Sequence, residues 1–322
     1  MSETNIKGDG YPVNPFFLIG CVRSGTTLLR LLLGHHPSIC KCEEFDFSVD
    51  FFEDNQSPPT LSDFHYYLKN HRGFKLSRYK IDKTLCYHEL LNSFLRQRQI
   101  EDARPVVGAT VHSNFHKLVE IWPDAKFIYL RRDPRNVSRS IIKQGWAGTT
   151  WHGTLPWNKA ETSWKDLKKM ISSKQCKEIR YEDLIVDTIG TLEVILSHID
   201  LNFNPEMLEI EKDTTYNRPN SNEAQHWSKS ATPEEIQLVE VCADELLLNA
   251  GYEHSQLPIL HISSLKKLQL NMRNRYNKIR FFINKYGLLL WLLSITSRRL
   301  PFDDLRTDIQ LRIDEVTNKH MK

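Results

Sequence analysis

The sequence lacks the segments that would anchor a chain in a membrane or send it across one. Its longest uncharged apolar stretch, residues 286–297, is shorter than the roughly 18 residues of a spanning helix. Residues 1–14 are polar and contain no apolar core, so we expect no secretory signal peptide. These absences predict a cytoplasmic protein.

Cysteine pairs, metal-ligand clusters and an excess of one charge are also missing. The six cysteines are scattered, and no two pairs have the spacing of a zinc site, so we expect free thiols and no bound metal. A net charge of +3 is too small to indicate nucleic acid as a partner. With 40% hydrophobic and 26% charged residues, the composition is typical of a folded globular protein.

Short apolar runs alternate with helical patterns along most of the chain. Strands are predicted at residues 16–19, 106–108, 126–130 and 176–179. Helical patterns separate them, residues 180–183 are expected in a loop, and a capping box predicts a helix over 232–249. This order predicts an α/β fold, a P-loop-type doubly wound parallel sheet flanked by helices.

The most informative segment is the loop at residues 20–27, after the first predicted strand. Gly20 and Gly25 have the spacing of a phosphate-binding loop, but Thr26 occupies the lysine position. Because that lysine reaches the β- and γ-phosphates of a nucleoside triphosphate, its absence disfavours ATP and GTP. The alternative is an ordinary tight turn, although Arg23 and three hydroxyl side chains offer more donors than a turn needs.

A second anion site is predicted where the third strand ends. Arg132 lies in the exit loop of that strand, and Ser140 lies just over one turn into the following helix. In doubly wound sheets, ligands bind beyond the carboxyl ends of the strands. Two anion sites side by side indicate a nucleotide that is phosphorylated at two places.

Together these motifs resemble the sulfotransferases that use 3′-phosphoadenosine 5′-phosphosulfate (PAPS) as donor, over roughly residues 14–254. Residues 23–27 resemble the 5′-phosphosulfate loop, 132–140 the 3′-phosphate motif, 180–184 the motif whose tyrosine contacts the adenine region, and 217–227 the loop that closes over the nucleotide. The resemblance implies the following PAPS-binding residues: Arg23, Ser24, Gly25, Thr26, Thr27, Arg132, Ser140, Tyr181 and Trp227. Residues 145–148 are similar to a bacterial group of these enzymes.

The resemblance leaves two candidates for the general base. A more distant likeness to tyrosylprotein sulfotransferases, through residues 36–44, implies Glu44; the alternative is that Glu43 and Glu44 are solvated acids at a helix start. His112 is the rival, because cytosolic sulfotransferases carry a histidine base at a strand end. The lysine that many relatives place near the bridging oxygen is absent, and Arg23 is our first candidate to stabilise the leaving group.

Residues 255–322 are predicted to form a basic amphipathic helical extension to a catalytic domain at 14–254. Six apolar residues follow helical spacing: Leu265, Leu268, Met272, Tyr276, Ile279 and Ile283. No acidic residue lies between Glu253 and Asp303, a stretch that holds nine lysines and arginines. This pattern fits contact with the inner face of a membrane through residues 262–300. The alternative is an arm packed on the catalytic domain or on a second subunit of a homodimer.

The function predicted from the sequence is transfer of the sulfuryl group of PAPS to a hydroxyl or amine, by in-line displacement with a general base and without a metal. The acceptor is expected to be a small molecule, a lipid-linked compound or a glycan. One alternative is a P-loop kinase or NTPase, which Thr26 disfavours. The other is a non-catalytic, membrane-associated nucleotide-binding protein, which the missing lysine leaves open.

Overall fold

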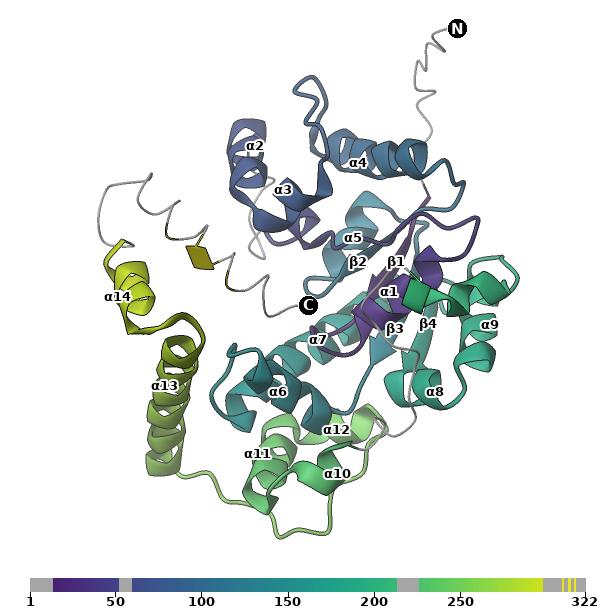
Figure 1. The fold of residues 1–322 in the computed structure, drawn as a ribbon. Coiled ribbons are helices and arrows are strands. Elements are labelled where there is room, and N and C mark those ends of the chain that lie inside the picture. The colour runs from purple at the N-terminus through teal and green to yellow at the C-terminus, as the bar shows by residue number, and fades with distance from the viewer. Residues whose placement is uncertain are drawn as a thin grey trace, which may run out of the picture. The chain divides into compact units, whose positions relative to one another are not determined.

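A computed structural model of the chain describes residues 14–51, 60–212 and 226–297, with single residues 309, 312, 313 and 316. Most of the loop expected at 217–227 lies outside the described residues. Four parallel strands form one sheet in the order β2-β1-β3-β4, with β1 at Phe16–Ile19, β2 at Gly108–Val111, β3 at Lys126–Arg131 and β4 at Cys176–Arg180 (Figure 1).

The chain forms two compact units. The first comprises Met1–Arg132 and Lys159–Ala224, and the second comprises Asp133–Asn158 and Gln225–Lys322. These units are defined by their internal contacts, so the division predicted from the sequence, into 14–254 and 255–322, stays a prediction.

The first unit holds the sheet and most of the helices. Its helices are α1 (Thr26–Gly34), α2 (Leu61–Asn70), α3 (Arg72–Ser77), α4 (Tyr87–Asp102), α5 (His116–Ile121), α8 (Tyr181–Val186) and α9 (Thr188–His198), with 3₁₀ turns η1 (Asp46–Ser48), η2 (Pro205–Leu208) and η3 (Ile210–Lys212). Helix α7 (Thr150–Met170) begins in the second unit and ends in the first.

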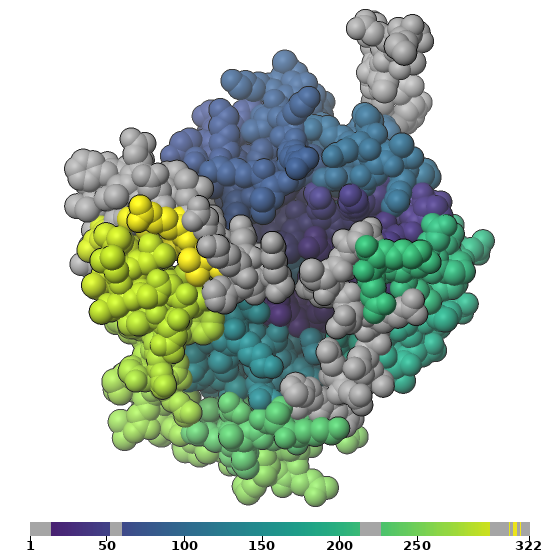
Figure 2. All heavy atoms as spheres, viewed as in Figure 1, coloured from purple at the N-terminus to yellow at the C-terminus, as the bar shows by residue number. Residues whose placement is uncertain are grey.

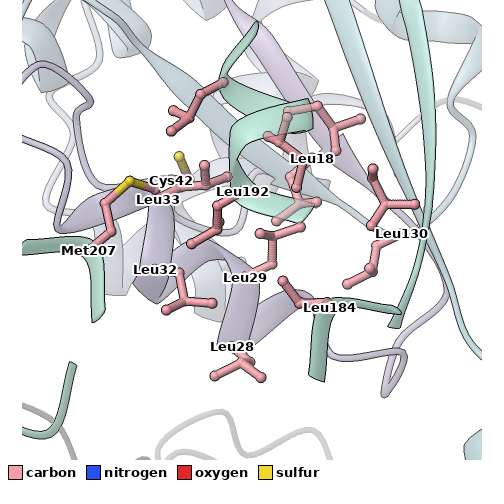
Figure 3. Packing of buried hydrophobic residues seen from close by; sticks show 14 of the residues in the cluster. Leu18, Leu28, Leu29, Leu32, Leu33, Cys42, Leu130, Leu184, Leu192 and Met207 are labelled. Carbon is pink, nitrogen blue, oxygen red and sulfur yellow. The ribbon is translucent and has the colours of Figure 1, made fainter. Parts of the chain in front are cut away.

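One face of the sheet packs on leucine-rich helices. Alternate residues of the strands, among them Leu18 of β1 and Leu130 of β3, are fully buried against α1, α8 and α9. Figure 3 shows Leu29 of α1 among the side chains of Leu18, Leu130, Leu184 and Leu192. Since side chains alternate between the two faces of a strand, this core holds the start of α1 directly against the end of β1.

The opposite face is aromatic. Phe17 of β1 stacks on Phe127 of β3, with ring centroids 5.8 Å apart, and contacts Trp122. Tyr129 of β3 stacks on Trp164 of α7 at 4.7 Å. Because both faces of the central strands β1 and β3 are covered, these two strands are largely apolar runs in the sequence. The predicted α/β doubly wound parallel sheet is confirmed.

Three local predictions were wrong. Strand β2 begins at Gly108, two residues later than expected, because Val106 forms an isolated bridge with Ile39 instead. Residues 181–183 open helix α8, whose first turn carries Glu182 and Asp183, and acids at that position favour a helix start. The helix expected over 232–249 is broken by Asp244, whose φ is +43°.

The second unit is helical among its described residues. Its helices are α6 (Pro134–Lys143), α10 (His226–Ser230), α11 (Pro233–Ala243), α12 (Glu245–Asn249), α13 (Ser264–Tyr286) and α14 (Leu288–Ser297). Within the described ranges, no single helix is long and apolar enough to cross a membrane. Helices α13 and α14 pass that test only as a pair bent by 116°, on length and composition alone.

Candidate functional site

A candidate site residue or loop directly follows the carboxyl end of each of the four parallel strands. The loop that begins at Gly20 follows β1, His112 follows β2, Arg132 follows β3 and Tyr181 follows β4. Strand order reverses around β1, and the carboxyl edge beside such a reversal is where doubly wound sheets bind ligands.

The loop after β1 is shaped by its close approach to β3 and to Tyr181. A Cβ atom on Gly20 would lie 2.4 Å from the carbonyl oxygen of Leu130, so only a glycine lets the backbone pass. Gly25 has φ +99°, and a Cβ atom there would lie 2.3 Å from Cδ2 of Tyr181. Arg23 also has a left-handed backbone, with φ +69°. When the sign of φ alternates along successive residues, their backbone N–H groups point into one concave surface that can bind an anion.

Helix α1 begins in this loop with its amino end open. Gly25 is the N-cap and contributes no side-chain hydrogen bond, and the first turn carries no acidic residue. The N–H groups at such an end attract an anion, helped by the helix dipole. Thr26 is buried and Thr27 is half-buried at this end. The arrangement can hold a phosphate or a phosphosulfate.

Ser24 has a different part in the loop. Its hydroxyl and its backbone N–H both donate to the carbonyl oxygen of Cys21, at 2.5 and 3.1 Å, and the residue is fully buried. These bonds hold the turn closed from the inside.

Arg132 joins three of the predicted motifs within the first unit. Its guanidinium carbon lies 4.0 Å from the ring centroid of Tyr181, and its Nη1 donates to the carbonyl oxygen of Arg23 at 3.3 Å. Tyr181 in turn lies against Gly25. The structure therefore brings together the loop after β1, the arginine after β3 and the tyrosine after β4.

Ser140 and Trp227 belong to the second unit. Ser140 lies on α6 and is half-buried. The Trp227 ring lies 3.8 Å from the guanidinium carbon of Arg135, and its backbone N–H donates to Oδ1 of Asn136 at 3.0 Å. Since Ser140 and Arg132 lie in different units, a phosphate shared by the two stays a prediction.

His112 is fixed by two hydrogen bonds to one carboxylate. The backbone N–H of His112 donates to Oδ1 of Asp46 at 2.7 Å, and its Nδ1 lies 2.9 Å from Oδ2. Its other ring nitrogen, Nε2, lies 3.2 Å from Oγ1 of Thr26 in the loop after β1. The chain Asp46–His112–Thr26 therefore couples the end of β2 to the amino end of α1.

Asp46 also sets the protonation of His112. Burial lowers the pKa of the imidazole. The charge and the hydrogen bond of Asp46, together with the charge of Glu44, raise it by more than burial lowers it, so the net pKa lies above its ordinary value. Asp46 was not among the site residues predicted from the sequence. It opens the 3₁₀ turn η1 two residues after Glu44, and no motif in the sequence contains it.

Glu43 and Glu44 point to different surroundings. Glu43 forms an ion pair with the buried Arg98. Glu44 is exposed, and its backbone pairs with Thr110 beside β2, two residues before His112. Glu44 is therefore exposed and close enough to His112 for its charge to act on the imidazole, while Glu43 is held by its partner.

Arg131 and Arg135 form buried ion pairs. Arg131 bonds Glu161 through Nε and Nη2 at 3.0 Å each, and Nη1 of Arg135 lies 2.9 Å from Glu240. Neither residue lies on the surface. Within the part of the chain that the structure describes, no group of three or more His, Cys, Asp or Glu could hold a metal ion.

Comparison with known proteins gives one consistent result. The model of the sulfotransferase family matches residues 15–205, more than half of the chain. The protein-tyrosine sulfotransferase of Drosophila melanogaster is 27% identical over 220 residues, which are 63% of this chain and 41% of that protein. The protein-tyrosine sulfotransferase A of Caenorhabditis elegans is 25% identical over 224 residues, 65% of this chain and 56% of that protein. The chain thus spans only about half the length of these relatives.

Among solved structures, the sulfotransferase domain of the olefin synthase from Synechococcus PCC 7002 has a similar fold. It superposes with a TM-score of 0.54 over 74% of this chain and 97% of that domain, at 21% identity. At that identity the likeness shows a shared fold.

Proposed function

The chain belongs to the sulfotransferase family, and we propose that it transfers the sulfuryl group of PAPS to a hydroxyl or amine of an acceptor. The observation that supports PAPS best is the loop after β1. It presents the open amino end of α1, has a threonine where a triphosphate-binding loop has lysine, and contacts Arg132, the candidate for a second phosphate.

The donor would bind along the carboxyl edge of the sheet. The 5′-phosphosulfate would accept hydrogen bonds from backbone N–H groups of residues 25–27 and of Arg23, and from the Arg23 side chain, with the hydroxyls of Thr26 and Thr27. Ser24 would contribute by keeping the turn closed. Arg132 and Ser140 would bind the 3′-phosphate, and Tyr181 and Trp227 would contact the adenine region. These roles distinguish PAPS from ATP, which has no 3′-phosphate.

The acceptor proton would go to Glu44 or to His112. The exposure of Glu44 favours its access to an acceptor. The contact of His112 with Thr26 sets that imidazole against the loop after β1, residues 20–27, which we call the donor loop because it would hold PAPS. Sulfuryl transfer needs in-line geometry and charge stabilisation more than covalent catalysis, so positioning by the loop and by Arg23 would supply much of the rate.

Isothermal titration calorimetry with adenosine 3′,5′-bisphosphate (PAP) and with ATP tests the proposal. We expect PAP to bind at micromolar concentration or below and ATP to bind far more weakly. Arg132→Ala should weaken PAP binding and reduce the preference over ATP, because it removes the candidate 3′-phosphate contact. Tighter binding of ATP than of PAP would reject the proposal.

A membrane surface is a further proposed partner, through residues 262–300. On one side of α13, Asn274 accepts from Gly148 N–H at 2.6 Å and Asn277 donates to Gly148 O at 2.7 Å. On the other side, four apolar residues are more than half exposed: Leu265, Leu268, Met272 and Tyr276. Figure 2 shows α13 and α14 in yellow-green at the surface. An outward apolar face flanked by basic residues suits an anionic lipid surface.

Sedimentation with anionic and neutral vesicles tests this partner. Met272→Glu should abolish binding to anionic vesicles and leave PAP binding unchanged. No binding by the unchanged protein would reject the membrane, and equal binding by the variant would reject this face as the contact. A concentration-dependent dimer that Met272→Glu disrupts would assign the face to a second copy. A lipid-linked acceptor would follow from membrane binding, whereas a soluble small molecule or glycan would follow from its absence. In either case we propose that the enzyme works in the cytoplasm.

A further inference from the structure

We infer that His112, held by Asp46, provides at the donor loop the positive charge that a lysine provides in other phosphate-binding loops. The inference rests on the proposed function and assigns Asp46 as a positioning residue. It also decides between the two candidate bases, because a histidine that carries the loop's positive charge leaves Glu44 to take the acceptor proton.

His112 lies against the loop position that a lysine occupies in other phosphate-binding loops. Thr26 occupies the position at which a phosphate-binding loop has the lysine that reaches the outer phosphates. The structure sets the Nε2 atom of His112 at 3.2 Å from the hydroxyl of Thr26 itself. A cation therefore reaches the same loop position from the end of the neighbouring strand β2, instead of from α1.

Asp46 holds His112 through both of its carboxylate oxygens. One carboxylate oxygen accepts from the backbone N–H of His112 and the other faces Nδ1, so the carboxylate is locked and Nδ1 carries a proton. Nε2 is then the atom that faces the loop. A proton on Nε2 makes the ring a cation, whose charge Asp46 balances in a site where the side chain of His112 is only 12% exposed.

Charged groups from several elements act on the imidazole ring of His112. Asp46 in η1 and Glu44 in the preceding segment favour the protonated imidazole, while Arg30 of α1 and burial oppose it. Their balance raises the pKa of His112 above its ordinary value. Nε2 therefore keeps its proton to a higher pH than in an unperturbed histidine.

These groups give a balanced transfer step. The bond between sulfur and the bridging oxygen breaks, and its electron pair stays on that oxygen, which becomes part of the 5′-phosphate of PAP. The acceptor oxygen forms the new bond to sulfur, and its proton passes to the Glu44 carboxylate. His112 keeps its proton throughout and stabilises the negative charge that develops on the leaving oxygen.

Calorimetric titration of the full chain with PAP, from about pH 5 to about pH 9, tests the inference without a known acceptor. Phosphate groups of PAP titrate near pH 6, so each profile is compared with that of His112→Gln. If His112 acts as a cation, affinity is fully present below its pKa and is lost as pH rises through that pKa. The loss should be roughly tenfold to a hundredfold, the range of one charged hydrogen bond.

Three variants sharpen the result. Asp46→Asn should move the loss of affinity to lower pH, and His112→Lys should keep the affinity and move the loss to much higher pH. His88→Gln, at an exposed histidine of α4, is the matched control and should reproduce the unchanged profile. A purely structural role of Asp46 would lower stability without moving the pH dependence.

Two results would overturn the inference, and they are distinguishable. If the affinity for PAP depends on pH in the same way in the unchanged protein and in His112→Gln, and PAP still binds tightly, His112 does not provide the positive charge. The proposed function would be unaffected by that result. No PAP binding by the unchanged protein at any pH would overturn the proposed function and this inference with it.

Discussion

Replacing Gly25 by alanine should damage the donor loop more than any other single methyl group added to α1 or its cap. The methyl carbon would lie 2.3 Å from Cδ2 and 2.5 Å from Cε2 of Tyr181, where ordinary carbon contacts are about 3.5–4 Å. The ring must therefore move by more than about 1 Å. Because the Arg132 guanidinium lies on that ring, Arg132 must shift with it.

Two costs add up in this variant. A non-glycine residue at φ +99° is strained by about 1–2 kcal/mol, and forcing a methyl group into the packed ring costs about 1–3 kcal/mol. We therefore expect the free energy of unfolding to fall by about 2–5 kcal/mol, a large part of the about 5–15 kcal/mol that is typical of a domain. PAP binding should weaken too, because both flanks of its site are displaced.

Urea-induced unfolding measures this cost, with Gly34→Ala as the matched control at the other end of the same helix. A Cβ atom on Gly34 would meet its nearest atom, Cα of Lys41, at 3.9 Å, so this change should be neutral or slightly stabilising. In a Tyr181→Ala background, Gly25→Ala should cost only the backbone strain of about 1–2 kcal/mol. Equal unfolding midpoints for Gly25→Ala and Gly34→Ala would refute the contact with Tyr181.

Two further predictions use neighbouring carboxylates as controls. Glu44→Gln should abolish sulfuryl transfer, measured as PAP release with an accepted substrate. Glu43→Gln should retain transfer, because Glu43 is paired with Arg98. Equal activities of the two variants would exclude Glu44 as the base. Glu161→Gln should lower the free energy of unfolding by about 3–5 kcal/mol in urea, because it leaves the buried Arg131 without its main counter-charge. Asp166→Asn, which breaks only an exposed pair, should cost less than about 1 kcal/mol, and a similar loss in both variants would contradict the role of burial.

The sequence predicts the central strands well because burial on both faces leaves a continuous apolar signal. Strand β1 is found over its predicted range and β3 is one residue longer than expected. Strand β2 is harder, since its buried Thr110 looks polar in the sequence. The Thr110 hydroxyl donates to the carbonyl oxygen of Cys42, a contact between residues far apart in the chain. No local pattern contains that information.

The same limit explains what the sequence missed at the site. Gly20, Arg23 and Arg132 stand in recognisable motifs, so their place at strand ends could be predicted. Asp46 belongs to no motif, and its importance depends on the pairing of residues 43–45 beside β2, which brings it to His112. Sequence spacing can predict which side chains interact at a site only where those residues lie in the same segment of the chain.

A crystal structure of the complex with PAP would test the central claim most directly. The account predicts the 5′-phosphate on the backbone N–H groups of Arg23 and residues 25–27, within hydrogen-bond reach of Nε2 of His112, and the 3′-phosphate beside Arg132. A nucleotide bound elsewhere, or a loop after β1 that contacts no phosphate of the bound PAP, would contradict it.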